Sequence, residues 1–341
     1  MNCTEKTVMY QHPDAIFDEA YEAVETDVST YVPLTGTAST TKREKNAVLL
    51  RFDNGSARIS CPLSGVMRLQ IGPDTAATFR SHTEQLKLIQ VPNNRLHCPV
   101  ISDYNSTGLL ADKLLMLLNR SSADFTVREQ SGLPYVRSKD HGIHFSPRPG
   151  KDGTYPYLAR FCKDPDEAVF GFGGRIAPPR RDSTTADIFA VKTGLNSGDY
   201  GGFPVPFFIS TKGYGVFLNN PWPHVYFDMG HTREDEWFVH APGGDCDFFF
   251  IHGPGFAEII QKYTQLTGRP PVPPRWMLGF WCSSLSFETA DQVLSVAKRL
   301  RKESWPADVI VLDGPWRGGP DFIPHYQKYH VYKTNDIDWH K

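Results

Sequence analysis

Asp313 directly follows a run of four apolar residues, VIVL, and Trp316 lies three residues further on. If that run is a buried parallel strand, Asp313 lies at its carboxyl end, where barrel enzymes hold their working groups. In a cleft of low dielectric constant, a carboxylate there accepts charge-assisted hydrogen bonds from sugar hydroxyls. Two other interpretations stay open: Asp313 can be a helix cap or loop residue, and Trp316 can pack in a core instead of supporting a sugar ring.

Other titratable residues give weaker signals. Asp336 and Asp338 are less favoured for ligand contact, and His325, His330 and His340 lack the spacing of metal ligands. The six cysteines are scattered, and they form neither a CxxC pair nor a Cys/His cluster. We therefore expect buried thiols and no metal, nucleotide or redox cofactor.

The elements that must position Asp313 form a β-α-β unit. Trp276–Cys282 (WMLGFWC) and Val309–Leu312 have the continuous apolar character of buried parallel strands. Between them an amphipathic helix is predicted, with an apolar stripe of Ala290, Val293, Leu294, Ala297 and Leu300. A capping box of Thr289 and Gln292, or else Ser286, begins this helix. The two strands should pair in parallel through a right-handed crossover.

The preceding region, residues 46–268, predicts short strands broken by Gly, Pro, Asn and Asp. At least ten segments fit, among them NAVLLRF, ARISCPLSGVMRLQIGP, TFRSHTEQLKLIQV, KLLMLLN, DFTVREQ, FPVPFFIST, GYGVFLNN, EWFVHA and CDFFFIHG. This pattern is typical of an antiparallel β-sandwich. The region ends in a helix within HGPGFAEIIQKYTQLTGRP, where Ala257, Ile260, Tyr263 and Thr264 share a face and Gly268 terminates the helix.

Two further segments carry no predicted chemistry. Residues 1–45 are expected to be a leader and linker, with one amphipathic helix over Asp14–Val28 and a polar segment after it. The glycine-rich run AVFGFGGR, Ala168–Arg175, is not followed by a helix, so we interpret it as a tight β-turn and not as a phosphate-binding loop.

Composition excludes several classes of protein. The net charge is −2, which offers no basic surface for nucleic acid or an acidic membrane. No apolar segment is long enough to span a membrane, and no secretory signal is recognised, so a cytoplasmic location is expected. Aromatic residues make up 13% of the chain, which fits a β-rich core and also a sugar-binding cleft. An oligomeric state cannot be deduced from the sequence.

Three segments together resemble a known family. GYGVFLNN, GRPPVPPRWMLGFW and LRKESWPADVIVLDGPW are similar to glycoside hydrolase family 31, the α-glucosidases and α-xylosidases. The resemblance covers roughly Glu167–Trp339. It implies a mainly β fold: an antiparallel β-sandwich over residues 46–268, then, over residues 269–341, the first β-α-β of an incomplete (β/α)8 barrel.

The resemblance also implies retaining, exo-acting hydrolysis of an α-linked oligosaccharide or glycoside. One carboxylate attacks the anomeric carbon and a second protonates the leaving oxygen, about 5 Å away. In the family both carboxylates come from later barrel strands, near the fourth and the sixth. This chain holds two or three of eight strands, so we expect no catalytic residue in it and no activity of the chain alone.

The sugar pocket is the part of the site that carries over. By resemblance Asp313 binds substrate hydroxyls, Trp316 is the tryptophan that follows it, and Trp281 belongs to the first-strand motif. Asp199 and Tyr200 lie in SGDYGGFPVPFF, which matches a sandwich loop over the barrel mouth. The chain has FAVK where the family often has a Trp-Asn-Asp element, and its CSSLSF loop is short, so the substrate stays open.

A non-catalytic carbohydrate-binding or interaction module that keeps the sandwich is the alternative.

Overall fold

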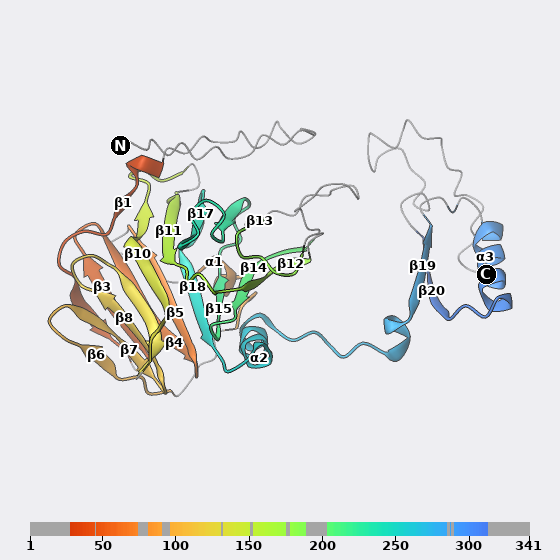
Figure 1. The fold of residues 1–341 in the computed structure, drawn as a ribbon, viewed down its shortest axis with the longest axis horizontal. Coiled ribbons are helices and arrows are strands. Elements are labelled where there is room, and N and C mark those ends of the chain that lie inside the picture. The colour runs from red at the N-terminus through yellow and green to blue at the C-terminus, as the bar shows by residue number, and fades with distance from the viewer. Residues whose placement is uncertain are drawn as a thin grey trace. The chain divides into compact units, whose positions relative to one another are not determined.

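The computed structural model describes residues 28–44, 46–73, 81–90, 96–130, 132–150, 153–174, 178–188, 203–284, 287 and 290–312. The chain divides into two compact units, Met1–Arg269 and Pro270–Lys341 (Figure 1). The predicted helix over Asp14–Val28 lies outside the described residues.

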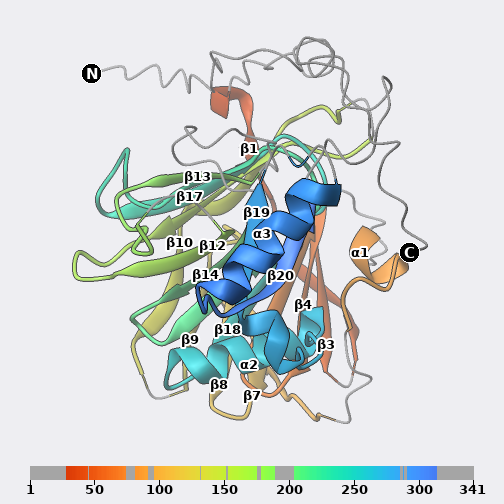
Figure 2. The same ribbon diagram turned by 90° about the vertical axis from the view of Figure 1, so that its right-hand side faces the viewer.

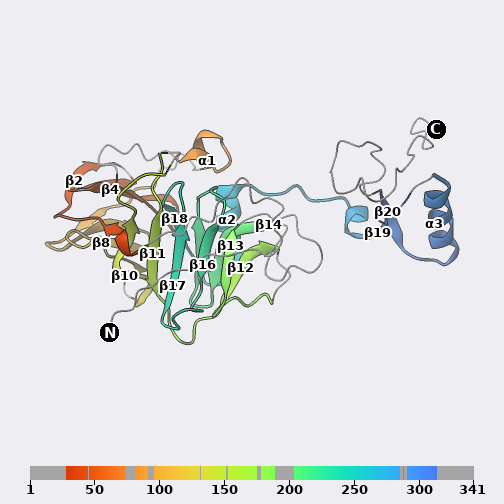
Figure 3. The ribbon, with the colours of Figure 1, turned by 90° about the horizontal axis from the view of Figure 1, so that it is seen from above.

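The first unit is built from two antiparallel sheets, which confirms the predicted sandwich. A ten-stranded sheet has the order β13-β16-β17-β11-β10-β9-β8-β7-β6, with β1 paired to β10 (Figure 3). Its strands are β1 Val32–Pro33, β6 Val100–Ser102, β7 Ser106–Ala111, β8 Leu114–Asn119, β9 Phe125–Glu129, β10 Pro134–Phe145, β11 Tyr157–Cys162, β13 Thr185–Ile188, β16 Val225–Asp228 and β17 Glu236–Ala241.

The second, eight-stranded sheet has the order β12-β14-β15-β18-β5-β4-β3-β2. Its strands are β2 Ser39–Arg43, β3 Ala47–Phe52, β4 Gly55–Leu63, β5 Val66–Gly72, β12 Val169–Gly174, β14 Phe203–Ser210, β15 Tyr214–Leu218 and β18 Asp247–His252. The helical segments of this unit are η1 Val28–Thr30, α1 His82–Gln85 and α2 Phe256–Thr267.

Side chains from both sheets meet in one apolar core. Phe161 of β11 stacks on its cross-strand partner Trp237 of β17, with ring centroids 3.7 Å apart. Phe248 and Phe250 of β18 enter the same core from the other sheet. Aromatic cross-strand pairs of this kind stabilise a sheet beyond the burial of their area.

The outer face of the eight-stranded sheet is covered by α2, which contacts β15 and β18 (Figure 2). Phe249 and Ile251 of β18 lie on this face, and they pack with Ile259 and Leu266 of the helix. Tyr263 stacks on Phe207 at 4.0 Å. Both faces of β18 are therefore buried, which explains its continuous apolar run DFFFIH.

The expected helix is confirmed, but its predicted apolar face is not. Ile259 and Leu266 are buried, whereas Ile260 is 46% exposed. The difference arises because the stripe that packs on the sheet consists of Ile259, Tyr263 and Leu266, which are four and three residues apart.

Residues 28–44 differ from the linker expected there. β1 pairs with β10, and β2 pairs with β3, so this segment adds a strand to each sheet. Leu34 and Ala38 belong to the central core. Their apolar character is diluted among Thr, Ser and Gly, which hid the strands in the sequence.

Two further segments differ from their predicted structures. TFRSHTEQLKLIQV contains the short helix α1 instead of a strand. The glycine-rich run, whose segment AVFGFGG also has the strand pattern, forms the strand β12 and not a tight turn; its register shifts between Gly171 and Gly173. Phe172, at φ 70°, turns into the core there, and a Cβ on Gly173 would lie 2.0 Å from the Phe203 carbonyl oxygen. Glycine is thus required by a β-bulge.

The second unit contains η2 Arg275–Leu278, β19 Phe280–Ser284, α3 Ala290–Lys302 and β20 Ala307–Leu312. β19 and β20 pair in parallel, as expected, and α3 lies along them (Figure 2). The first strand begins four residues later than predicted, because a 3-10 turn closed by Gly279 N–H to the Trp276 carbonyl precedes it. Among the described strands, each of these two has one unpaired edge.

This unit buries few side chains. Phe287 and Ala307 are the buried apolar residues among its described positions. The predicted stripe of α3 is at most half-buried, and its Leu294 is 53% exposed. Parallel sheets are typically covered on both faces, and among the described residues α3 is the one α-helix that contacts this pair of strands.

In the sandwich, His240 of β17 is a buried titratable side chain. Its Nε2 lies 3.4 Å from the Tyr31 hydroxyl, and its buried Nδ1 has no hydrogen-bond partner among the described residues. Burial lowers the pKa of His240 from 6.5 to about 4. Between these values the unfolded chain binds the proton and the folded chain does not.

We predict that His240 reduces the stability of the sandwich as the pH falls from 6.5 to 4. The loss attributable to this residue is about 2–3 kcal/mol, because protonation favours the unfolded state throughout that window. Urea unfolding at several pH values should show a flatter profile for His240→Gln than for the parent. The control His231→Gln changes an exposed histidine and should keep the parent slope; equal slopes in all three proteins would contradict the assignment.

Candidate functional site

The carboxyl end of the β19–β20 pair is the candidate site. In the parallel register Ser283 pairs with Val311 and Ser284 with Leu312, so both strands end at the same level. Asp313 is the next residue after Leu312. In parallel barrels, this edge of the sheet carries the working groups.

Local sequence explains why the two strands form here. Proline residues before η2 prevent the preceding segment from joining a sheet interior, and Gly279 ends the 3-10 turn. A Cβ on Gly279 would lie 1.8 Å from Asp308 Oδ2, so glycine allows β19 to approach β20. In α3, Arg299, Arg301 and Lys302 fall in the last turn, where positive charge complements the helix dipole.

Of the five predicted sugar-binding residues, Trp281 lies within the described part of the chain. It is the second residue of β19, its ring stacks on Trp276 with centroids 6.4 Å apart, and its Nε1 donates to the Met277 carbonyl at 3.0 Å. These contacts direct the ring toward the segment before the strand. Three residues of strand, about 10 Å, separate it from the carboxyl end.

Asp313, Trp316, Asp199 and Tyr200 lie outside the described residues. The structure therefore brings no two of the five predicted residues together within its described part. Asp336, Asp338 and the three C-terminal histidines, His325, His330 and His340, are outside it as well.

The sequence did not indicate a buried cluster of charges in the sandwich, centred on Arg68 of β5. Its guanidinium binds Asp247 through two contacts, Nε to Oδ1 at 2.8 Å and Nη2 to Oδ2 at 2.6 Å. It also binds Glu84 of α1, with Nη2 to Oε2 at 2.6 Å. Asn219 donates to Asp247 Oδ2 at 2.7 Å and accepts from the Thr83 hydroxyl.

The electrostatics of this cluster favour the charged forms of Arg68 and Glu84, whereas burial outweighs the pull of Arg68 on Asp247 and raises the pKa of that carboxyl above 3.8. Burial opposes the charge on Arg68, but Asp247 and Glu84 outweigh it and raise the pKa of the guanidinium. Burial likewise opposes the charge on Glu84, yet Arg68 lowers the pKa of that carboxyl below 4.5. Since each acceptor is matched by a donor, the cluster fixes α1 and β18 to β5 and leaves no group for a ligand.

The sequence did contain a signal for this buried cluster of charges. Arg68 and Gln70 interrupt the apolar strand β5, VMRLQIG, and both are buried. A charge inside an otherwise buried strand implies a paired partner. What the sequence did not supply was the identity of Asp247, which is 179 residues away.

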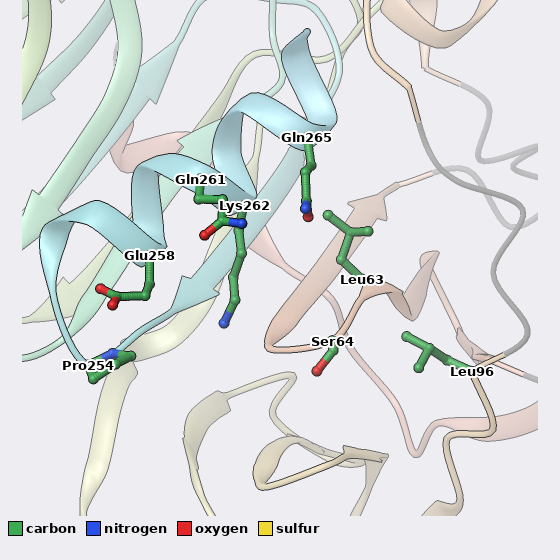
Figure 4. A pocket seen from close by; sticks show the side chains of 8 residues that line it. All are labelled: Leu63, Ser64, Leu96, Pro254, Glu258, Gln261, Lys262 and Gln265. Carbon is green, nitrogen blue, oxygen red and sulfur yellow. The ribbon is translucent and has the colours of Figure 1, made fainter. Parts of the chain in front are cut away.

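A cavity of about 430 Å³ lies between α2 and the turn that joins β4 to β5 (Figure 4). Leu63, Ser64 and Leu96 form one side of it, and Glu258, Gln261, Lys262 and Gln265 of α2, with Pro254, line the other. Lys262 Nζ donates to the His252 carbonyl oxygen, and burial lowers the pKa of the ammonium. The lining has no aromatic ring on which a sugar could stack.

The described residues contain no group of three or more His, Cys, Asp or Glu side chains that could hold a metal ion. Within the same part of the chain, no helix has the length and apolar character needed to cross a membrane.

Comparison with known proteins identifies the family. Residues 56–228 match the glycosyl hydrolase 31 N-terminal galactose mutarotase-like domain, and residues 270–340 match the family 31 TIM-barrel domain. The chain belongs to glycoside hydrolase family 31. The predicted family is thereby confirmed.

Two relatives show the extent of the similarity to other family 31 proteins. An α-xylosidase of Saccharolobus solfataricus is 28% identical over 71% of this chain and 31% of its own length. An α-glucosidase of Bacillus thermoamyloliquefaciens is 31% identical over 58% of the chain and 26% of its own. The chain thus spans about a third or less of these relatives.

A family 31 dextranase of Flavobacterium johnsoniae, solved in complex with glucose, has the same fold. It superposes with a TM-score of 0.74 at 21% identity, covering 90% of this chain and 36% of its own.

We predict that Arg68→Ala lowers the unfolding free energy of the sandwich by about 3–5 kcal/mol, because Asp247 is left as an unpaired buried charge. Urea unfolding followed by far-UV circular dichroism measures the change. The matched control is Arg137→Ala, which removes the exposed pair of Arg137 and Asp164 and should cost little. Similar losses in both variants would show that the buried cluster has no special role.

Proposed function

We propose that the chain is the N-terminal part of a retaining, exo-acting α-glycoside hydrolase and contributes to the pocket for the non-reducing-end sugar. The observation that carries the proposal is the order of the two family 31 matches, sandwich then barrel, along one chain. The α-xylosidase and α-glucosidase relatives suggest an α-linked glucoside or xyloside as substrate.

Asp313 is the proposed contact to the sugar. A carboxylate that follows β20 at the carboxyl end of the sheet accepts hydrogen bonds from vicinal hydroxyls and orients the ring. Trp316 would lie against the apolar face of that ring, and the family resemblance makes Asp199 and Tyr200 further candidates for sugar contact. The contacts of Trp281 with Trp276 and Met277 favour a supporting role below the pocket.

The chemistry would be completed by two carboxyl groups that stand about 5–5.5 Å apart across the glycosidic bond. The first forms a glycosyl-enzyme, and the second donates a proton to the leaving oxygen and then removes one from water. The family resemblance assigns both to barrel strands after β20. A polypeptide of these 341 residues would therefore bind a sugar without cleaving its glycoside.

We predict no hydrolysis of nitrophenyl α-glucoside or nitrophenyl α-xyloside by the 341-residue chain assayed alone. Release of nitrophenol should match that of Asp313→Asn and of a buffer blank. Hydrolysis by the parent chain that disappears in Asp313→Asn would show that this polypeptide is itself catalytic and would refute the proposed division of the site.

We predict that Asp313→Asn weakens the binding of glucose or xylose about 10- to 100-fold, the loss expected for hydrogen bonds to a charged acceptor. Titration calorimetry gives the dissociation constants. The matched control Asp308→Asn changes a carboxylate at the amino end of the same strand and should keep the parent affinity. Equal weakening in both variants would contradict a specific contact at Asp313.

A second candidate, a carbohydrate-binding or interaction module in the sandwich alone, is favoured by one observation. The sandwich has a complete core, whereas the described part of the second unit has two buried apolar residues. In that case sugar binding would persist in Asp313→Asn and disappear on substitution in the sandwich.

A further inference from the structure

Two cysteines from different sheets meet in the sandwich. Cys61 lies on β4 of the eight-stranded sheet, and Cys98 precedes β6 at the edge of the ten-stranded sheet. Each thiol affects the pKa of the other, and both cysteines belong to the same core cluster. Both residues are buried, with 0% and 3% of their surface exposed.

The pair lies beside the cavity of Figure 4. Leu63, two residues after Cys61, accepts a hydrogen bond from the Cys61 thiol through its carbonyl oxygen at 3.1 Å. Leu96, two residues before Cys98, lies with Leu63 on the same side of the cavity (Figure 4). Each cysteine is therefore two residues along the chain from a residue that lines the cavity.

The segment that carries Cys98 can adjust more easily than the strand that carries Cys61. Residues 96–99 precede β6 and have no regular secondary structure, whereas Cys61 is held in β4 between β3 and β5. A disulfide needs the two Cα atoms within about 4.4–6.8 Å. Any movement required to reach that distance falls on residues 96–99.

We propose that Cys61 and Cys98 form a reversible disulfide that joins the two sheets of the sandwich. The oxidant is a small-molecule disulfide such as oxidised glutathione. The Cys98 thiolate attacks one of its sulfur atoms, forms a mixed disulfide and releases one thiol. The Cys61 thiolate then attacks Cys98 Sγ and expels the second thiol. Two protein thiols and one disulfide thus become one protein disulfide and two small thiols.

The surroundings of the pair set the conditions for the reaction. Burial raises the pKa of both thiols, and the Asp112 carboxylate raises them further. Because the thiolate is the reacting form, oxidation should be slow at neutral pH and faster as the pH rises. The bond would close a loop that runs through β5 and α1, so it would stabilise the fold by restricting the unfolded chain.

The full chain is incubated with oxidised and reduced glutathione at several ratios, alkylated and digested without reduction. We expect one cross-linked peptide pair, Cys61 with Cys98, and a loss of two of the six reactive thiols in the denatured protein. Both changes should reverse with dithiothreitol. Oxidation should raise the Tm by about 5–10 °C.

Cys98→Ala should abolish the cross-link and the oxidation-dependent change in Tm, and its far-UV spectrum reports whether it folds. The matched control Cys246→Ala removes a buried cysteine outside the pair and should keep both. Absence of the Cys61–Cys98 peptide at every ratio would overturn the proposal. So would an equal rise in Tm on oxidation of Cys98→Ala.

Discussion

The sandwich depends on the burial of both faces of one sheet. The eight-stranded sheet presents Phe248 and Phe250 to the other sheet and Phe249 and Ile251 to α2. Period-two alternation places these side chains on opposite faces without any adjustment of the backbone. Because α2 follows directly after β18, the short connection holds the helix against the strand that it covers. A charge in this setting needs a partner, and Arg68 has two.

The β-α-β unit differs from the sandwich in how its sheet is buried. Its strands have the apolar character of a sheet covered on both sides, yet among the described residues α3 is the one α-helix that contacts them, beside the 3-10 turn η2. In a complete barrel the second face is filled by layers of side chains from the other strands. The sugar pocket that we propose at Asp313 would need the same surroundings, since a carboxylate discriminates between hydroxyls best where water is excluded.

Sequence reasoning succeeded where the pattern is local. Periodicity, together with glycine or proline at the ends of the elements, predicts three features: the alternation of β3 and β4, the helix α2, and the parallel pair of β19 and β20. Sequence reasoning failed where contacts between residues distant in the chain decide the local structure. Residues 28–44 become strands because β10 and β3 offer edges, and α1 is held by Arg68. For the sugar site, the motif predicts Asp313, but the geometry depends on strands beyond β20.

Among the described strands, β19 and β20 each have one unpaired edge, which affects how the protein behaves in solution. An apolar parallel strand with free N–H and C=O groups is a template for pairing with another chain. Neither strand carries a proline, and β20 has one charged residue, Asp308, at its amino end. Self-association in concentrated samples would therefore begin at the β-α-β unit, while the sandwich remains folded. Keeping the protein dilute, or covering this strand edge with a bound segment, would keep the chain monodisperse.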